Sequence, residues 1–380
     1  MKQALRRLRF PVAQSRGRRY PEPPHKYRNE FQRDRDRVVH ARAFRRLEDK
    51  TQVFPAGISD HFRNRLTHTI EVSQISRTVA AVLGLDEDLT EALALAHDIG
   101  HSPFAHAGEE ELNRQMAKFG ESFNHNLHAL HIVESFEQRY VRFPGLNLTF
   151  EVREGIVKHS GDLTPGSNPE LDEYLPELRP PLEAQLIDLA DEIAYDTADL
   201  DDGFSANLFS LDDIATSVPG YATILDRIET RFPGAPDRAR FQETLRSLID
   251  ELVSGLIEGT WEAAVEAGVN SVEDVRKHPW RLAMLTRPAK EITVHLKHFL
   301  RTKVYESEAI QAERQRSIAR LGALFEFYLA HPDRLPHPYR NQTTIQPVHR
   351  VVCDYIAGMT DGFFERTWQA IPELRESFPE

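Results

Sequence analysis

The sequence predicts an all-α protein, and three observations lead to this fold class. Apolar residues recur at intervals of three and four over most of the chain, as at Val72, Ile75, Val79 and Val82, which is the spacing of one helix face. Residues typical of helix starts and stops bracket several of these segments. No segment alternates apolar and polar residues for long enough to build a major β-sheet.

The first 60 residues are expected to hold little regular structure. Residues 1–30 are rich in arginine and proline and lack helical periodicity, so we expect a basic, extended N-terminal arm. Order is expected to begin near Phe31. A short helix is predicted over 36–47, and TQVFPAGISD at 51–60 is expected to be strand or loop.

The following helices carry clear boundary signals. A helix over 67–83 stops at Gly84. Asp88 opens a capping box for the next helix, and Ser102-Pro103 predicts an N-cap followed by proline at the first helical position. Later helices are expected over 125–136, 182–200, 238–258, 286–304, 310–330, 345–357 and 361–370. Proline-rich connections are expected over 160–182 and 331–342. We expect a core over 31–205 and a helical C-terminal part, 206–380, packed on it.

The composition is that of an ordinary globular protein. Apolar residues make up 40% and charged residues 28% of the 380 positions, a length with ample capacity to bury a core. No run approaches the roughly 18 apolar residues that a membrane-spanning helix needs, and no apolar stretch follows the N-terminal arginines as in a secretory signal. The single cysteine, Cys353, cannot form an internal disulfide. We therefore expect a cytoplasmic protein without a membrane partner.

Charge is distributed unevenly along the chain. The first 50 residues hold 16 Lys and Arg against 6 Asp and Glu, a net of +10, which leaves −22 for the rest because the whole chain carries −12. A basic segment on an acidic body indicates an anionic partner, such as a phosphate group, a nucleic acid or an acidic neighbouring subunit. The alternative is a solvated arginine-rich tail.

A polar cluster follows one apolar helix. The sequence ALAHDIGHSPFAH at 94–106 places His97 and Asp98 at the end of a helix whose other face is core. Adjacent helix residues diverge by about 100°, so both can bind one ion only if it lies beside the helix end. Further ligands would come from other helices, and the candidates are His68, near the start of the preceding helix, and Asp191.

Asp191 belongs to a polar stripe in which Tyr195 and Asp199 follow at every fourth residue. Such a stripe is usually solvated surface, but the tyrosine in its middle favours a half-buried cleft. Two histidines and two aspartates without a thiolate suit Mn²⁺, Fe²⁺, Mg²⁺, Ni²⁺ or Zn²⁺ and do not choose among them. Such an ion lowers the pKa of bound water from 15.7 to about 7 and polarises a phosphoryl oxygen, which favours phosphate-ester hydrolysis.

The order His68, His97-Asp98, Asp191 resembles the H…HD…D signature of the HD-domain metal-dependent phosphohydrolases. The narrower resemblance is to the deoxynucleoside triphosphate triphosphohydrolases of the bacterial dGTPase-like family. Six blocks stand in the order of that family: FQRDRDRVVHARAFRRLEDKTQVF, NRLTHTIEVSQISR, HDIGHSPFAHAGEEEL, FNHN, LADEIAYDTADLDDG and VVCDYIAGMTDGFF. The resemblance covers about residues 31–364 and implies an HD-domain helical bundle with additional C-terminal helices.

The resemblance also implies roles for individual residues. It implies metal ligands at His68, His97, Asp98 and Asp191. It implies that the catalytic His125 works with Glu109 next to the α-phosphate. It implies substrate contacts from Arg65, His101 and His106 to the phosphates, from Asp199 to the 3′-hydroxyl, from Tyr195 against the 2′ position, and from Gln52 to the sugar.

The function expected from this resemblance is hydrolysis of dGTP or several dNTPs to deoxynucleoside and inorganic triphosphate. Two alternatives stay open: another HD-domain phosphohydrolase, such as a nucleotidase or phosphodiesterase, and a single-stranded DNA-binding regulatory protein, which the basic N-terminus motivates. The resemblance also implies a homo-oligomer and a nucleotide effector. The chain departs from the family pattern at Glu121-Ser122, Ala198 and Gly362, which bears on substrate preference and regulation more than on the reaction.

Overall fold

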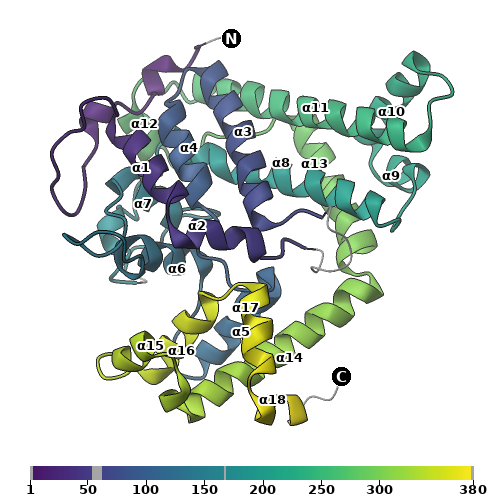
Figure 1. Ribbon diagram of the computed structural model, residues 1–380. Coiled ribbons are helices and arrows are strands. Elements are labelled where there is room, and N and C mark those ends of the chain that lie inside the picture. The colour runs from purple at the N-terminus through teal and green to yellow at the C-terminus, as the bar shows by residue number, and fades with distance from the viewer. Residues whose placement is uncertain (1–2, 54–61, 167, 378–380) are drawn as a thin grey trace. The chain divides into compact units, whose positions relative to one another are not determined.

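The computed structural model describes residues 3–53, 62–166 and 168–377 (Figure 1). Within these ranges the regular elements are helices, accompanied by isolated β-bridges and no sheet. The prediction of an all-α fold is therefore confirmed. None of the described helices is both long enough and apolar enough to cross a membrane.

Helices follow one another along the whole described chain. Up to residue 205 they are α1 (Glu30–Val39), α2 (Arg42–Arg46), α3 (Arg65–Leu83), α4 (Glu87–Ala96), α5 (Ala105–Ala117), α6 (His125–His131), α7 (Phe150–Val157) and α8 (Leu182–Ser205). Later come α9 (Leu211–Ser217), α10 (Pro219–Arg231), α11 (Asp237–Glu266), α12 (Val272–Lys277), α13 (Arg287–Leu300), α14 (Glu308–Ala330), α15 (His337–Gln342), α16 (Val348–Ala357), α17 (Asp361–Gln369) and α18 (Pro372–Ser377). Short 3-10 and π turns are η1 (Arg6–Leu8), η2 (Val12–Gln14), η3 (Leu47–Asp49), η4 (Ile132–Phe136), η5 (Asp172–Tyr174), η6 (Arg301–Tyr305) and η7 (Pro332–Arg334).

The chain divides into two compact units, each built from three stretches of sequence. Unit 1 consists of residues 1–36, 68–95 and 148–307. Unit 2 consists of residues 37–67, 96–147 and 308–380. The predicted boundaries after residues 30 and 205 do not coincide with this division, because each unit combines early segments with a long later one.

Unit 1 is organised around α8. This helix packs against α11 and α13, and α10 packs against the same two helices (Figure 1). The apolar face of α8 is buried through Leu186, Ala190 and Ile193. Burial of that face fixes the rotation of the helix, so its polar stripe is held in a defined direction.

The N-terminal segment differs from the predicted extended arm because it packs into unit 1. Leu5 and Leu8 are fully buried, and Phe10 is nearly so. The backbone N–H of Leu5 donates to the carbonyl of Leu83 at 2.9 Å. Order therefore begins well before Phe31, since apolar side chains between the arginines contribute to the core.

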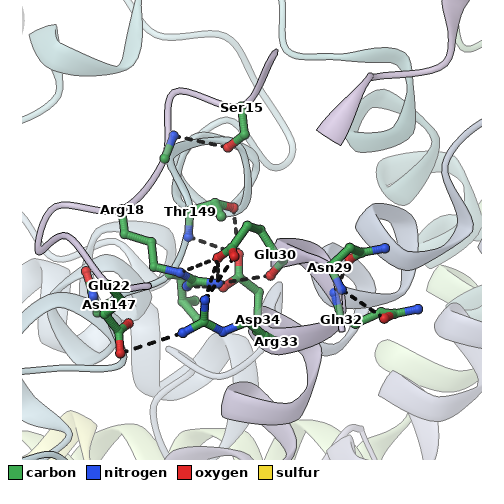
Figure 2. Close-up of polar contacts among 12 residues, drawn as sticks. Ser15, Arg18, Glu22, Asn29, Glu30, Gln32, Arg33, Asp34, Asn147 and Thr149 are labelled. Carbon is green, nitrogen blue, oxygen red and sulfur yellow. Dashed lines mark hydrogen bonds and ion pairs between the residues drawn. The ribbon is translucent and has the colours of Figure 1, made fainter. Parts of the chain in front are cut away.

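The arginines of this segment form ion pairs within unit 1. Figure 2 shows Arg18 beside the carboxylates of Glu30 and Asp34, and Arg18 donates to both of them, to Glu30 at 2.8 Å. The buried Asp34 also accepts from the backbone N–H and hydroxyl of Thr149, at 2.9 and 2.6 Å. Further pairs of the same kind join Arg9 to Asp86 and Arg35 to Glu91. Asp86 and Glu91 lie outside the first 50 residues, so the pairs that they form offset part of the positive surplus of that segment.

Unit 2 is built around α5, α14 and α16, which pack against one another. Their shared core includes Leu112, Leu321, Phe325 and Val352. The proline-rich stretch 331–342, expected to be a loop, contains α15 because its proline stands in the first turn, where a missing N–H removes no helix bond.

Several predicted boundaries need correction. The helix predicted over 36–47 is two helices, α1 and α2, and helices α7, α9, α10 and α12 were not predicted. Of the segment 51–60, expected to be strand or loop, residues 54–60 lie outside the described residues, whereas Thr51 forms an isolated bridge with Asn64.

Candidate active site

In unit 1, two of the predicted metal ligands lie side by side. His68 is in the first turn of α3, and Asp191 is in the middle of α8, 123 residues away. His68 Nε2 lies 2.7 Å from Asp191 Oδ1. The His68 side chain is buried, whereas the Asp191 side chain is 28% exposed. The fold of unit 1 therefore brings an imidazole and a carboxylate together at a partly open position.

A second histidine lies on the other side of Asp191. His159 Nε2 is 3.6 Å from Asp191 Oδ2, and its Nδ1 is 2.7 Å from Asp188 Oδ1. Arg281 donates to Asp188 and to the backbone carbonyl of Lys158. No site role was predicted for His159, and no spacing rule links it to α8, because its contact depends on how α7 and α8 lie in the folded unit.

The remaining polar stripe of α8 contacts a tyrosine for which no site role was predicted. Tyr305, the last residue of η6, donates its hydroxyl to Asp199 Oδ2 at 2.5 Å. Its ring centroid lies 6.1 Å from that of Tyr195, which in turn lies 6.4 Å from the ring of His68. Burial and the negative charge of Asp199 raise the pKa of Tyr305, so this hydroxyl remains a hydrogen-bond donor. Asp199, expected to accept from a sugar hydroxyl, accepts here from Tyr305.

In unit 2, Asp98 is held by a buried arginine. Arg65 Nη1 donates to both carboxylate oxygens of Asp98, at 2.8 and 2.7 Å, and Arg65 is only 2% exposed. His101 Nδ1 lies 2.8 Å from Asp98 Oδ1, and His97 Nε2 lies 3.9 Å from the same oxygen. Burial alone would raise the pKa of Asp98, but Arg65 and the two histidines hold it well below its usual range. The predicted contact of Arg65 with a triphosphate stays a prediction.

The two residues expected to act in catalysis form a hydrogen-bonded pair. His125, the first residue of α6, has its Nδ1 2.8 and 2.9 Å from the two oxygens of Glu109, and its backbone N–H donates to the same carboxylate at 3.0 Å. Asn124 caps α6 by accepting from the N–H groups of residues 126 and 127. The two neighbouring glutamates form ion pairs with other residues: Glu110 accepts from Arg314, and Glu111 accepts from Arg114. Glu109 is thus the carboxylate that orients His125.

Hydrogen bonding keeps Glu109 ionised. Burial would raise the pKa of its carboxyl, but the nearby His106 and the hydrogen-bonded His125 lower it far below the usual value. An ionised partner at Nδ1 leaves Nε2 of His125 as the nitrogen directed at other groups.

The two remaining histidines differ strongly in environment. His101 stacks on His125, with ring centroids 3.9 Å apart, and burial together with Arg65 lowers its pKa well below 6.5. His101 is therefore neutral near pH 7. The His106 side chain is 66% exposed, with Nδ1 3.9 Å from Glu109 Oε2.

The turn that carries these histidines has a strained backbone. The predicted helix start at Ser102-Pro103 is wrong, because Phe104 and Ala105 adopt positive φ angles of 62° and 52° and α5 begins only at Ala105. Each such residue costs roughly 1–2 kcal/mol. The turn also passes very close to α6: a Cβ at Gly100 would lie 2.1 Å from the carbonyl oxygen of His125, so glycine is required there.

Gln52 is the last of the predicted site residues, and its side chain is buried. It is 5% exposed, and its Oε1 has no hydrogen-bond partner among the described residues. A ligand that donates a hydrogen bond to this buried amide oxygen would remove the free-energy cost of leaving the oxygen unpaired.

Two pairs of donor atoms, one within each unit, have separations that suit ligands of a divalent metal ion. His68 Nε2 and Asp191 Oδ1 lie 2.7 Å apart in unit 1, and His97 Nε2 and Asp98 Oδ1 lie 3.9 Å apart in unit 2. Ligands about 2.0–2.2 Å from one ion have separations in this range.

Comparison with known proteins identifies the class. The family model of the HD domain matches residues 65–196, from the start of α3 to the middle of α8, and the phosphohydrolase-associated domain matches residues 283–370. With the all-helical fold, these matches define an HD-domain phosphohydrolase, a hydrolase class whose domains bind divalent metals.

Full-length relatives narrow the class. The chain is 45% identical over 353 residues to the deoxyguanosinetriphosphate triphosphohydrolase-like protein of Geobacter sulfurreducens, covering 92% of this chain and 90% of the relative. It is 43% identical over 379 residues to the protein of the same name from Caulobacter sp. (strain K31), covering 96% and 94%. It is 45% identical over 353 residues to that of Azoarcus sp. (strain BH72), covering 92% of each. This chain belongs to the deoxyguanosinetriphosphate triphosphohydrolase-like family.

Proposed function

We propose that this protein is a metal-dependent dNTP triphosphohydrolase, which cleaves a 2′-deoxynucleoside 5′-triphosphate into deoxynucleoside and inorganic triphosphate. The observation that carries the proposal is the hydrogen-bonded His125–Glu109 pair, in a chain whose relatives are named for this reaction. The substrate would be dGTP or several dNTPs.

We propose His68, His97, Asp98 and Asp191 as the ligands of the divalent ion. Mn²⁺, Mg²⁺, Fe²⁺, Ni²⁺ and Zn²⁺ are all compatible with these ligands. When bound, the ion supplies Lewis acidity and lowers the pKa of a coordinated water. His159 and Arg65 would hold the carboxylates of Asp191 and Asp98 in place.

Side chains of the protein would transfer the proton and bind the substrate. Cleavage breaks the bond between the α-phosphorus and the 5′-oxygen of the nucleoside. The 5′-oxygen is a good leaving group only if it gains a proton. His125 is suited to give or take that proton at Nε2, since the ionised Glu109 contacts its Nδ1. His101, His106 and Arg65 would face the phosphates.

The sugar would be selected by residues of α8 and by Gln52. A tyrosine ring at the 2′ position rejects an extra hydroxyl by steric conflict, which is the proposed role of Tyr195. Asp199 would accept from the 3′-hydroxyl beside Tyr305, and the buried Oε1 of Gln52 would accept from the sugar.

Two rival functions make different predictions. A nucleotidase or phosphodiesterase of the same class would act on monophosphates or cyclic nucleotides and not on dNTPs. A single-stranded DNA-binding role was motivated by the basic first 50 residues, yet arginines of this segment are paired with carboxylates of unit 1. In the described part of the chain, these pairs weaken the charge argument for that role. The homo-oligomer, the nucleotide effector and a cytoplasmic location stay predictions.

Product analysis tests the proposal. Purified protein is incubated with each of the four dNTPs and with GTP, with Mn²⁺, Mg²⁺ or no metal, and the products are separated by anion exchange. We expect triphosphate and deoxynucleoside in equal amounts from at least one dNTP. Release of pyrophosphate or orthophosphate would contradict the mechanism, and hydrolysis of monophosphates alone would support the rival.

A further inference from the structure

One carboxylate in unit 2 connects two separate segments. Asp361, the first residue of α17, is half-buried, and its two oxygens accept from different backbone N–H groups. Oδ1 accepts from Phe104 at 3.0 Å, and Oδ2 accepts from Thr51 at 2.8 Å. The helix does not need this carboxylate for its own cap, because the side chain of Thr360 accepts from the N–H of Phe363.

Neighbouring contacts hold the same segments together. Thr360 donates its hydroxyl to Asp49 at 2.9 Å, and Arg46 donates to the carbonyl of Gly358 at 2.9 Å. Lys50 donates to the carbonyls of Ala357 and His101. The turn 357–361, the segment 46–51 and the turn after Asp98 are therefore joined by one network of hydrogen bonds.

Both segments bound by Asp361 lead directly to residues with proposed substrate contacts. Thr51 precedes Gln52, and Phe104 lies between His101 and His106. Phe104 has a left-handed backbone and its ring packs edge-on against Phe364 of α17, with centroids 4.8 Å apart. Strained conformations at such places persist only where the surroundings fix them.

We propose that Asp361 is a positioning residue that holds the Gln52 segment and the His101–His106 turn at a fixed separation. This inference rests on the proposed function, in which Gln52 faces the sugar and His101 and His106 face the phosphates of one nucleotide. Asp361 touches no substrate in this scheme. It acts by fixing the two backbone segments between which the nucleotide's sugar and phosphates are recognised.

The test compares three variants of the full-length protein. Asp361→Ala removes both acceptors, and Asp361→Asn keeps one acceptor and the side-chain shape. Glu365→Gln, on the same helix, changes a half-exposed carboxylate that pairs with Arg320 and serves as the matched control. Hydrogen–deuterium exchange is followed in peptides covering 46–53 and 101–106, and kcat and KM are measured with a dNTP and Mn²⁺.

We expect Asp361→Asn to speed exchange by about tenfold in at least one of the two peptides, the effect of losing one hydrogen bond. We also expect KM for the dNTP to rise about tenfold while kcat changes by less than about threefold, because the His125–Glu109 pair is held by other contacts. Asp361→Ala should exceed Asp361→Asn in both measurements, and Glu365→Gln should match wild type. If Asp361→Ala does not fold, Asp361→Asn alone decides the question.

The outcomes separate this inference from the proposed function. Unchanged exchange in the two peptides of Asp361→Asn would overturn the inference, and so would faster exchange with an unchanged KM. An equal loss of kcat and metal content would indicate a general structural role and would also overturn it. If wild type releases no triphosphate from any dNTP, the proposed function fails, and the substrate role of Asp361 fails with it.

Discussion

Replacing Glu183 by glutamine tests how the N-terminal segment is held in unit 1. Glu183 stands in the first turn of α8, and its Oε1 accepts from the N–H groups of Phe10 and Asp86, at 2.8 and 3.0 Å. Its Oε2 has no hydrogen-bond partner among the described residues. Burial raises the pKa of this carboxyl from 4.5 to about 7, although the two N–H groups oppose the shift. Glutamine keeps the acceptor and the shape but cannot ionise.

The pH dependence follows from the two pKa values. The folded chain binds the proton of Glu183 more tightly than the unfolded chain, so this group favours folding fully below pH 4.5. That contribution is lost as the pH rises from 4.5 through about 7. Since each tenfold change in an acid constant is worth about 1.4 kcal/mol, the whole difference amounts to about 3 kcal/mol.

The assay is urea unfolding of wild type and Glu183→Gln at pH 5 and pH 8. We expect the variant to be more stable than wild type by about 3 kcal/mol at pH 8 and by less than about 1 kcal/mol at pH 5. Glu177→Gln, at an exposed glutamate, is the control and should leave both values unchanged. The same stability difference at both pH values would refute the reasoning, because the effect would then not come from ionisation.

Three further predictions concern the site and the N-terminal segment. His125→Ala should lower kcat for a dNTP by about 10²–10⁴ without loss of bound metal, as measured by steady-state kinetics and metal analysis; a retained kcat would exclude His125 as the proton-transfer group. Tyr195→Ala should raise the ratio of kcat/KM for GTP to that for dGTP by about tenfold or more, and an unchanged ratio would remove the proposed sugar selection. Asp34→Ala removes one of the two carboxylates that face the buried Arg18 and the acceptor of the Thr149 N–H and hydroxyl, and should destabilise unit 1 by about 3–5 kcal/mol in urea unfolding, whereas Asp36→Ala, at a more exposed pair, should cost far less.

Helices with a strong periodic pattern were predictable, but the start of α5 was not. Helices α3, α8, α14 and α16 lie within a few residues of their predicted ranges except at the C-terminus of α8, because apolar spacing and end signals are local. Ser102-Pro103 looked like an equally good start for α5. The turn instead continues through the left-handed Phe104, which is held by Asp361, a residue 257 positions away. No local pattern carries that information.

The same distinction separates the predicted site residues from the missed ones. The sequence indicated that His68 and Asp191, or His125 and Glu109, belong together because they occur in recognisable blocks, and the structure shows each pair in contact. Tyr305 was missed although it donates to Asp199, since it lies at the end of a π turn outside any block. Its contact arises only from the packing of α13 on α8.

Net charge along the sequence proved a poor guide to the charge that the folded chain presents. The +10 of the first 50 residues indicated an anionic partner, yet the arm folds onto unit 1, where Leu5, Leu8 and Phe10 are buried. Burying each of these side chains contributes about 1.5–3 kcal/mol. That burial brings Arg9 and Arg18 against Asp86 and Asp34. A segment in which apolar residues separate the arginines at short intervals is therefore as compatible with a packed segment that forms internal ion pairs as with a free basic arm. Burial of the apolar residues between the charges determines which of the two forms.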